Sequence, residues 1–284
     1  MEIKSVRAVY FSATRTTEKI VTCISKTIAD IMGAEYKPYS FSLPQARTRQ
    51  LAFSKDDLVV LGVPVYAGRV PNVLLPFIKE KIMGDGTLAV PIVLFGNRDF
   101  DDALIELRNI MRENGFHTIS AGAFVGEHSF SSTLAAGRPD DDDMALAVKL
   151  GEETARKIKN MTDRPAEAIH VTGKEPIRPY YTPRDRNGNP INILKVKPNT
   201  DISKCANCGV CRDTCVMGSI DACDASKIGG ICIKCCACIK QCPVGAKYFD
   251  DEGYLYHKHE LEDVYKRRAA SELFYQNLNT HEIK

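Results

Sequence analysis

Ten of the eleven cysteines lie between positions 205 and 242, and nine of these belong to two runs with the same spacing. The first run is CANCGVCRDTCVMGS (residues 205–219) and the second is CIKCCACIKQCPVGA (residues 232–246). Both follow C-x2-C-x2-C-x3-C, and they align without a gap at an offset of 27 residues. Thiolate is a soft ligand that suits a tetrahedral iron–sulfur cage. This spacing lets one loop supply three corners of a cubane [4Fe–4S] cluster, while the other run supplies the fourth.

The duplicated run resembles the two-cluster bacterial-type ferredoxins. The resemblance implies two ligand sets, Cys205, Cys208, Cys211 and Cys242 for one cluster and Cys232, Cys235, Cys238 and Cys215 for the other. The first run departs from the family pattern at Val216, where a proline is usual. Structural zinc is the competing interpretation because C-x2-C pairs also bind zinc, but eight thiolates in two such runs do not suit a four-thiolate site.

Three cysteines lie outside this ligand set. Cys236 takes the place that Gly209 holds in the first run, and we expect a small buried thiol there. Exchange of Cys223 or Cys236 with a ligand is the alternative, and Cys23 is expected in the core. An odd number of cysteines, with no export leader expected, argues against a disulfide framework and for metal ligation in a reducing cytoplasm.

A second chemical feature is the stretch VYFSATRTTEKIV, residues 9–21, which places hydroxyl side chains and an arginine between an apolar strand and a helix. Backbone N–H groups and the helix dipole favour a phosphate at such a turn. The turn lacks the G-K-[ST] ending of a P-loop and the G-x-G-x-x-G of a dinucleotide site. The hydroxyls therefore suit a terminal monophosphate.

The elements that must position this turn alternate short apolar strands with amphipathic helices, which predicts an α/β fold with a doubly wound, five-stranded parallel sheet. Ile20, Ile24, Ile28 and Ile31 recur at helical spacing, as do Leu104, Leu107 and Met111. Residues 140–143 are expected to cap a last helix that reaches Ile158, rather than to form a metal or partner site. The strands are expected at residues 6–11, 35–41, 58–63, 88–95 and 118–125.

This first part resembles flavodoxin, whose S-x-T-G-x-T turn holds the phosphate of FMN. The resemblance implies phosphate contacts from Ser12, Thr14, Thr16 and Thr17. Arg15 replaces the usual glycine, and it either contacts the phosphate or points into solvent.

Two further loops carry the flavodoxin resemblance. After the third strand, GVPVYAGRVPN would place Tyr66 against the isoalloxazine ring, with flavin contacts also expected from Pro64, Val65, Ala67 and Gly68. After the fourth strand, FGNRDF would place Gly96, Asn97, Arg98 and Phe100 at the flavin, with the arginine at its polar edge. Beyond the fifth strand, His128 or Ser129 could approach the flavin. A structural or solvent-facing histidine is the alternative, so no catalytic residue is predicted.

Composition shifts suggest how the chain is divided. We expect a flavodoxin-like FMN-binding domain (residues 1–160), a proline-rich wrapping linker (161–200), a small α+β two-cluster ferredoxin domain (201–250) and a helical tail (251–284). In the tail, HELEDVYKRRAASELFYQNL (residues 259–278) is predicted to be a helix that packs back on the body, with Leu261, Val264, Ala269 and Leu273 near one side.

Taken as a whole, the chain resembles the fusions of a flavodoxin-like domain with a two-cluster ferredoxin that occur in anaerobes. The resemblance implies an iron–sulfur flavoprotein that holds FMN and two [4Fe–4S] clusters and links a low-potential donor protein to an acceptor. One alternative is a flavin-dependent reductase of a small molecule, fed by its own clusters. Another is a regulatory module in which the clusters are structural.

Charge and hydropathy narrow the possible partners. The formal net charge is +2, and no basic stripe indicates nucleic-acid binding. No apolar run reaches the roughly 18 residues of a membrane span. We therefore expect a cytoplasmic protein with redox protein partners, and the sequence identifies neither the donor nor the acceptor.

Overall fold

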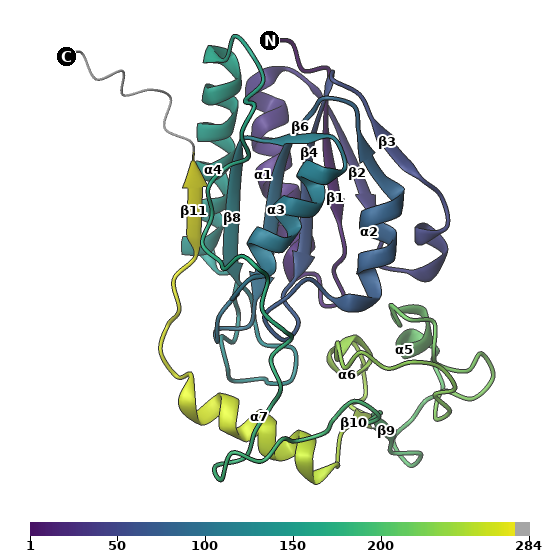
Figure 1. Ribbon diagram of the computed structural model, residues 1–284. Coiled ribbons are helices and arrows are strands. Elements are labelled where there is room, and N and C mark those ends of the chain that lie inside the picture. The colour runs from purple at the N-terminus through teal and green to yellow at the C-terminus, as the bar shows by residue number, and fades with distance from the viewer. Residues whose placement is uncertain (276–284) are drawn as a thin grey trace.

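The computed structural model describes residues 1–275 as an α/β protein with a mainly parallel central sheet (Figure 1). Five parallel strands lie in the order β2-β1-β4-β6-β8, which is the 2-1-3-4-5 order of flavodoxin-like sheets. The five predicted strands are confirmed, each within two residues at either end. Their bounds are β1 (Ser5–Tyr10), β2 (Glu35–Ser40), β4 (Asp57–Pro64), β6 (Thr87–Phe95) and β8 (Ser120–Val125).

Helices cover both faces of the sheet (Figure 1). Helices α1 (Thr16–Met32) and α4 (Asp141–Asn160) pack on one face, and α2 (Leu75–Lys81) and α3 (Ala103–Glu113) pack on the other. The predicted apolar side of α1 is confirmed at Ile20, Ile24 and Ile28, which are fully buried, but not at Ile31, which is exposed in the last turn. Within residues 1–275, no helix has the length and apolar character needed to cross a bilayer.

The start of α4 is capped as predicted. The Asp140 carboxylate accepts a hydrogen bond from the backbone N–H of Asp143 (3.3 Å), and the Asp143 carboxylate accepts one from the N–H of Asp140 (3.1 Å). This reciprocal box satisfies N–H groups that have no partner inside the helix. The Asp143 carboxylate also binds the buried guanidinium of Arg138.

Shorter elements escaped the sequence analysis. Three-residue strands are too short to show an apolar periodicity, so the pattern could not predict them. Strands β3 and β5 pair in parallel away from the main sheet, and β7 pairs with β6. These elements are η1 (Pro44–Arg47), β3 (Leu51–Phe53), η2 (Asn72–Leu74), β5 (Ile82–Gly84) and β7 (Phe116–Thr118).

Residues 161–198 wrap around the sheet part without a helix or strand, apart from one isolated bridge. The segment is anchored on the fully buried Asp102, whose carboxylate accepts hydrogen bonds from the backbone N–H groups of Lys174 (3.0 Å) and Arg178 (2.9 Å). The Arg178 guanidinium also binds this carboxylate and holds the pKa of Asp102 down at about 2. An ionised aspartate therefore fixes the wrapping segment.

The cysteine-rich part is built from short elements around the two runs. Its strands pair antiparallel, with Lys247 opposite Thr200. A small apolar cluster of Cys211, Ile220 and Ala225 is in contact with Cys215 of the first run and Cys238 of the second. The elements are β9 (Asn199–Thr200), α5 (Val210–Asp213), α6 (Ala237–Lys240) and β10 (Lys247–Tyr248).

The predicted helix over residues 259–278 is wrong beyond Val264. Helix α7 (Glu252–Val264) ends there, and strand β11 (Glu272–Tyr275) pairs antiparallel with β8, which extends the sheet by one strand (Figure 1). Leu273 lies opposite Gly122 in this pair. Between α7 and β11, the side chains of Asn97 and Arg138 bind backbone carbonyls of residues 265–269. These contacts hold the backbone out of a helix, although the apolar residues have helical spacing. Residues 276–278 lie outside the described part.

Candidate functional site

The hydroxyl-rich turn lies between β1 and α1, at the carboxyl edge of the sheet. The Ser12 hydroxyl accepts a hydrogen bond from the N–H of Glu18 (3.1 Å), which ties the turn to the first turn of the helix. Arg15 adopts the left-handed conformation (φ 67°), at the position where the flavodoxin turn has glycine. The backbone therefore keeps a glycine-type turn although the residue carries a long cationic side chain.

Several groups at this turn are free to bind an anion. Within residues 1–275, no hydrogen bond or ion pair engages the side chains of Thr14, Arg15 or Thr16, and Thr17 is buried behind them. Helix α1 is long and starts here, so its N–H groups add to the attraction for negative charge. These donors fit the phosphate of FMN.

The turn opens into a cavity of about 620 Å³. Its walls are rich in cations and come from three parts of the chain: the turn and α1, the loop after β8, and the second cysteine run. The lining residues are Thr14, Arg15, Thr16, Lys19, Glu127, Gly137, Arg138, Pro139, Lys240 and Gln241.

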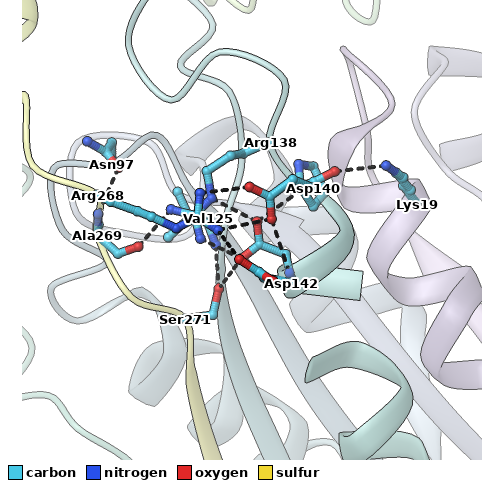
Figure 2. Close-up of polar contacts among 11 residues, drawn as sticks. Lys19, Asn97, Val125, Arg138, Asp140, Asp142, Arg268, Ala269 and Ser271 are labelled. Carbon is cyan, nitrogen blue, oxygen red and sulfur yellow. Dashed lines mark hydrogen bonds and ion pairs between the residues drawn. The ribbon is translucent and has the colours of Figure 1, made fainter. Parts of the chain in front are cut away.

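Two of these cations are fixed by neighbours (Figure 2). The Lys19 ammonium donates to the carbonyl of Pro139 (2.8 Å). The Arg138 guanidinium donates to the Asp143 carboxylate (Nε–Oδ2 2.7 Å) and to the carbonyl of Ala269 (2.7 Å). Arg138 therefore joins the cavity wall to the C-terminal segment.

The loop after β4 turns back on itself through a bridge between Tyr66 and Arg69, with Ala67 (φ 52°) and Gly68 (φ 77°) in the left-handed region. The carbonyl of Ala67 accepts a hydrogen bond from the N–H of Tyr181 (2.8 Å). Pro64, Val65 and Tyr66 are half-buried. Burial, and after it the charge of Cys235 and two neighbouring cysteines, raises the pKa of Tyr66 well above its ordinary value. The predicted flavin-stacking ring thus lies close to the second cysteine run.

The loop after β6 is held by the protein itself. The buried Asn97 amide donates to the carbonyls of Tyr265 and Arg267 (both 2.7 Å), and its oxygen accepts from the N–H of Ala269 (3.2 Å). Phe100 packs in the core against Phe95, with 5.6 Å between ring centroids. The side chains of Asn97 and Phe100, which were predicted to contact the flavin, are therefore bound to other parts of the protein.

Arg98 and Gly96 of the same loop are also closely packed. Arg98 pairs with Asp101 and lies over the ring of Tyr181, at 4.6 Å from its centroid. A Cβ added to Gly96 would meet the His128 ring at 2.4 Å, so only glycine fits beside that histidine. Burial, then nearby cations, lowers the pKa of His128 to about 3. The histidine is neutral at pH 7 and carries no proton to donate as an imidazolium.

The four cysteines of the second predicted ligand set, together with Cys236, line one cavity. The four are Cys215, Cys232, Cys235 and Cys238, and the remaining walls of the cavity are mostly apolar. Burial, and after it the neighbouring thiols, raises the pKa of Cys235 and of Cys238 to about 12. Thiolates gathered here need cationic partners, which the irons of a cubane would supply. These four residues fit a [4Fe–4S] cluster.

The first cysteine set lies nearer the surface. Cys211 is buried beside Ile220, and Cys205 packs against the same cluster, whereas Cys208 is exposed. Burial raises the pKa of Cys242, but hydrogen bonds from four backbone N–H groups, that of Ala246 foremost, outweigh it and lower the pKa overall. Backbone donors of this kind stabilise a thiolate.

No three His, Cys, Asp or Glu side chains of the described chain converge as the ligands of a single metal ion would. The four thiolates of a cubane each bind a different iron, so they surround a larger body than one ion.

Residues of the two runs that are 27 positions apart also have the same backbone conformation. Gly218 and Gly245 have φ of 60° and 61°, and Asn207 and Lys234 have φ of 48° and 56°. The N–H of Ser219 donates to the Cys215 sulfur (3.4 Å), as the N–H of Ala246 does to that of Cys242 (3.2 Å). Helices α5 and α6 are likewise 27 residues apart. The two runs are therefore structural repeats.

The surplus cysteines differ in environment. Cys236 is buried and has φ of 59°, at the position where Gly209 has φ of 78°. Its thiol lies 3.4 Å from the Tyr254 hydroxyl. Cys223 is exposed and Cys23 is half-buried on α1.

Seven lining residues of the cation-rich cavity were not predicted from the sequence, and five of them carry charged or amide side chains: Lys19, Glu127, Arg138, Lys240 and Gln241. Lys19 lies near the start of α1, four residues after the N-cap Arg15, and this spacing could have found it. The other four reach the turn through contacts between distant segments, which no local pattern signals.

Comparison with known proteins found similar folds among solved structures, while no family model and no curated protein matches the sequence. The chain is similar to a flavodoxin from an archaeon, with 18% identity, 55% of this chain and 99% of that chain covered, and a TM-score of 0.41. An apo NADH:FMN oxidoreductase matches with 17% identity, coverages of 58% and 91%, and a TM-score of 0.41. Flavodoxin 2 from Bacillus cereus matches with 17% identity, coverages of 54% and 99%, and a TM-score of 0.40. At these scores, the fold assignment rests on the strand order.

Proposed function

We propose that the protein is an electron-transfer iron–sulfur flavoprotein. In this proposal residues 1–160 hold FMN, residues 201–250 hold two [4Fe–4S] clusters, and the segment between them wraps the two parts together. Electrons pass between a low-potential donor protein and an acceptor through both cofactor types. The observation that carries the proposal is that the second cysteine run contacts the anion turn directly, through the hydrogen bond from the Gln241 side chain to the carbonyl of Ala13 (3.2 Å).

The residues of the turn would bind the phosphate of FMN. Thr14 and Thr16, which line the cavity, would supply hydroxyls, and Arg15 would supply a charge there. The expected contacts of Ser12 and Thr17 fit less well, because the Ser12 hydroxyl binds the N–H of Glu18 and Thr17 is buried. Tyr66 would pack against the flavin ring, and the backbone of Ala67 and Gly68 would bond its edge. When bound, FMN carries one or two electrons and each cluster carries one.

The cysteine sets would have different positions on the electron path. Of the second set, Cys235 packs on the apolar core of the sheet part, and Val216, next to Cys215, belongs to that core. The Arg47 guanidinium also donates to the carbonyl of Val216 (2.7 Å). Cys208 of the other set is exposed. The cluster bound by Cys205, Cys208, Cys211 and Cys242 would therefore exchange electrons with a partner protein. The cluster bound by Cys215, Cys232, Cys235 and Cys238 would exchange them with the flavin.

The test is anaerobic purification followed by quantitation of iron, sulfide and FMN, and a redox titration followed by EPR and absorbance. We expect about eight irons, about eight sulfides and one FMN per chain, with two reducible cubanes. Protein that contained zinc in place of iron, or that contained no flavin, would contradict the proposal.

A further inference from the structure

The two cysteine repeats share their backbone but differ in the two residues before the last cysteine. In the second run these are Lys240 and Gln241, and their equivalents 27 positions earlier are Asp213 and Thr214. The pairs have different chemistry: one is cationic and long, and the other is acidic and short. The contacts of the two pairs differ in the same way.

In the first run these contacts are local. The Asp213 carboxylate pairs with the adjacent Arg212 (2.8 Å), and the Thr214 hydroxyl donates to the carbonyl of Val210 (2.8 Å). Neither side chain has a hydrogen bond or ion pair to residues 1–160 in the described structure. This half of the repeat is independent of the sheet part at these positions.

In the second run both side chains reach the sheet part. The Lys240 ammonium pairs with the Glu127 carboxylate and donates to the carbonyls of His128 (3.1 Å) and Ser131 (2.9 Å). The Gln241 amide donates to the carbonyl of Ala13 (3.2 Å). Lys240 thus holds the loop after β8, and Gln241 holds the peptide group that precedes Thr14.

Both residues also line the cation-rich cavity beside the turn. They lie between Cys238, a predicted ligand of one cluster, and Cys242, a predicted ligand of the other. Clusters would fix both ends of this five-residue segment, and the fixed segment would then hold the turn in its binding conformation. Ordering a binding site in advance removes part of the conformational entropy that is otherwise lost when the ligand binds.

We propose that Lys240 and Gln241 couple FMN binding to cluster loading, so that the protein with clusters binds FMN more tightly than the protein without them. The inference rests on the proposed function, since it needs both cofactors. Coupling between two binding sites is reciprocal, so bound FMN must also strengthen the equilibrium retention of the clusters by the same factor. Lys240 and Gln241 are positioning residues in this account, because they act through the turn and the loop.

The test compares FMN affinity by anaerobic fluorescence titration of FMN-depleted protein, with clusters intact and after iron removal by a chelator. For the wild type we expect an increase in the Kd of about tenfold when the clusters are removed, which lies within the usual range of coupling between sites. In the K240M/Q241A double variant, the cluster-loaded protein should bind FMN about as weakly as its cluster-free form. The fraction of iron that the protein retains at equilibrium over a series of chelator concentrations, with and without FMN, gives the reciprocal readout.

The matched control is D213N/T214V, which changes the equivalent positions of the first run and should keep the tenfold difference. The single variant Q241A tests the bridge to Ala13 without disturbing Glu127, and it should lose part of the coupling. Equal Kd values for wild-type protein with and without clusters would overturn the inference, as would full coupling in the double variant. Failure of wild-type protein to take up FMN or clusters would instead overturn the proposed function and the coupling together.

Discussion

Each face of the central sheet buries a broad set of apolar side chains. In the described chain, the cysteine-rich part has only a small apolar cluster of its own, which consists of Cys211, Ile220 and Ala225. The sheet part is therefore stabilised by the hydrophobic effect. The cysteine-rich part encloses thiols in an apolar cavity and has short helices and two-residue strands. Parts with so little core of their own commonly depend on metal ligation for their fold.

This difference gives the largest predicted effect. Under the proposed function, removal of iron by a chelator should unfold residues 201–250, because the bonds from cysteine to iron would replace the missing core there, while the sheet should stay folded. Hydrogen exchange followed by mass spectrometry would show fast exchange in the cysteine-rich part and continued protection of β4 and β6. Protection of residues 201–250 after complete iron loss would contradict the comparison.

Arg138 offers the largest effect on the sheet part. Its side chain and that of Asp143 are 6% and 1% exposed. Arg138→Met should lower the free energy of unfolding by about 3–5 kcal/mol, because it leaves a buried carboxylate without its partner. Chemical denaturation followed by circular dichroism would measure this.

Arg268 is the matched control, since it pairs with Asp140 in the same network (Figure 2) but is 53% exposed. Arg268→Met should change the free energy of unfolding by less than about 1 kcal/mol. Equal losses in the two variants would show that burial does not decide the effect.

Gly62 tests how closely α1 packs on the sheet. A Cβ at this position would lie 2.2 Å from Cγ2 of Val21, so Gly62→Ala should destabilise the sheet part by about 1–3 kcal/mol through overpacking. Chemical denaturation followed by circular dichroism would measure this loss of stability. Gly137→Ala is a poor control because of its positive φ, whereas Gly229→Ala meets no atom within 4 Å. A neutral Gly62→Ala variant would contradict the packing described for α1.

The buried side chain of His128 should make the free energy of unfolding depend on pH. Its pKa falls from the ordinary 6.5 to about 3 in the folded protein, chiefly because it is buried. The unfolded chain therefore binds more protons between these values, and stability that is present above pH 6.5 is lost as the pH falls toward 3. Between pH 7.5 and 5.5 this histidine should lower the free energy of unfolding by about 1 kcal/mol.

The measurement is denaturation at a series of pH values for the wild type and His128→Gln. The variant should show a shallower slope, although His257, whose pKa is lowered to about 4 by burial, keeps a dependence of the same sign. An unchanged slope would mean that His128 does not titrate as a buried group.

The smallest effect is expected at Cys236. Cys236→Gly places in the second repeat the residue of the first, at a left-handed position that glycine tolerates best. Iron content should stay unchanged, whereas Cys238→Ser should lose a cluster. Loss of iron in Cys236→Gly would make Cys236 a ligand.

Local patterns in the sequence predicted what local physics determines. Apolar spacing located the long strands and the buried side of α1, and the acidic residues at 140–143 located a helix cap. The ungapped alignment of the two cysteine runs has a structural counterpart, because equivalent residues of each run adopt the left-handed conformation. Each of these features depends on residues close together in the chain.

Contacts between distant segments could not be predicted in this way. The helical spacing of Ala269 and Leu273 was overridden because Asn97 and Arg138 bind the backbone of residues 265–269 and β8 pairs with β11. Likewise, nothing in the second cysteine run shows that Gln241 meets Ala13, 228 positions away.

The central claim is that flavin and clusters in one chain exchange electrons directly. The most direct measurement is rapid anaerobic reduction of the clusters, followed by the absorbance of the flavin at several protein concentrations. We expect flavin reduction at a first-order rate that does not change with protein concentration, since an exchange within one chain needs no encounter. A rate that rises in proportion to protein concentration, or a flavin that stays oxidised beside reduced clusters, would contradict the account.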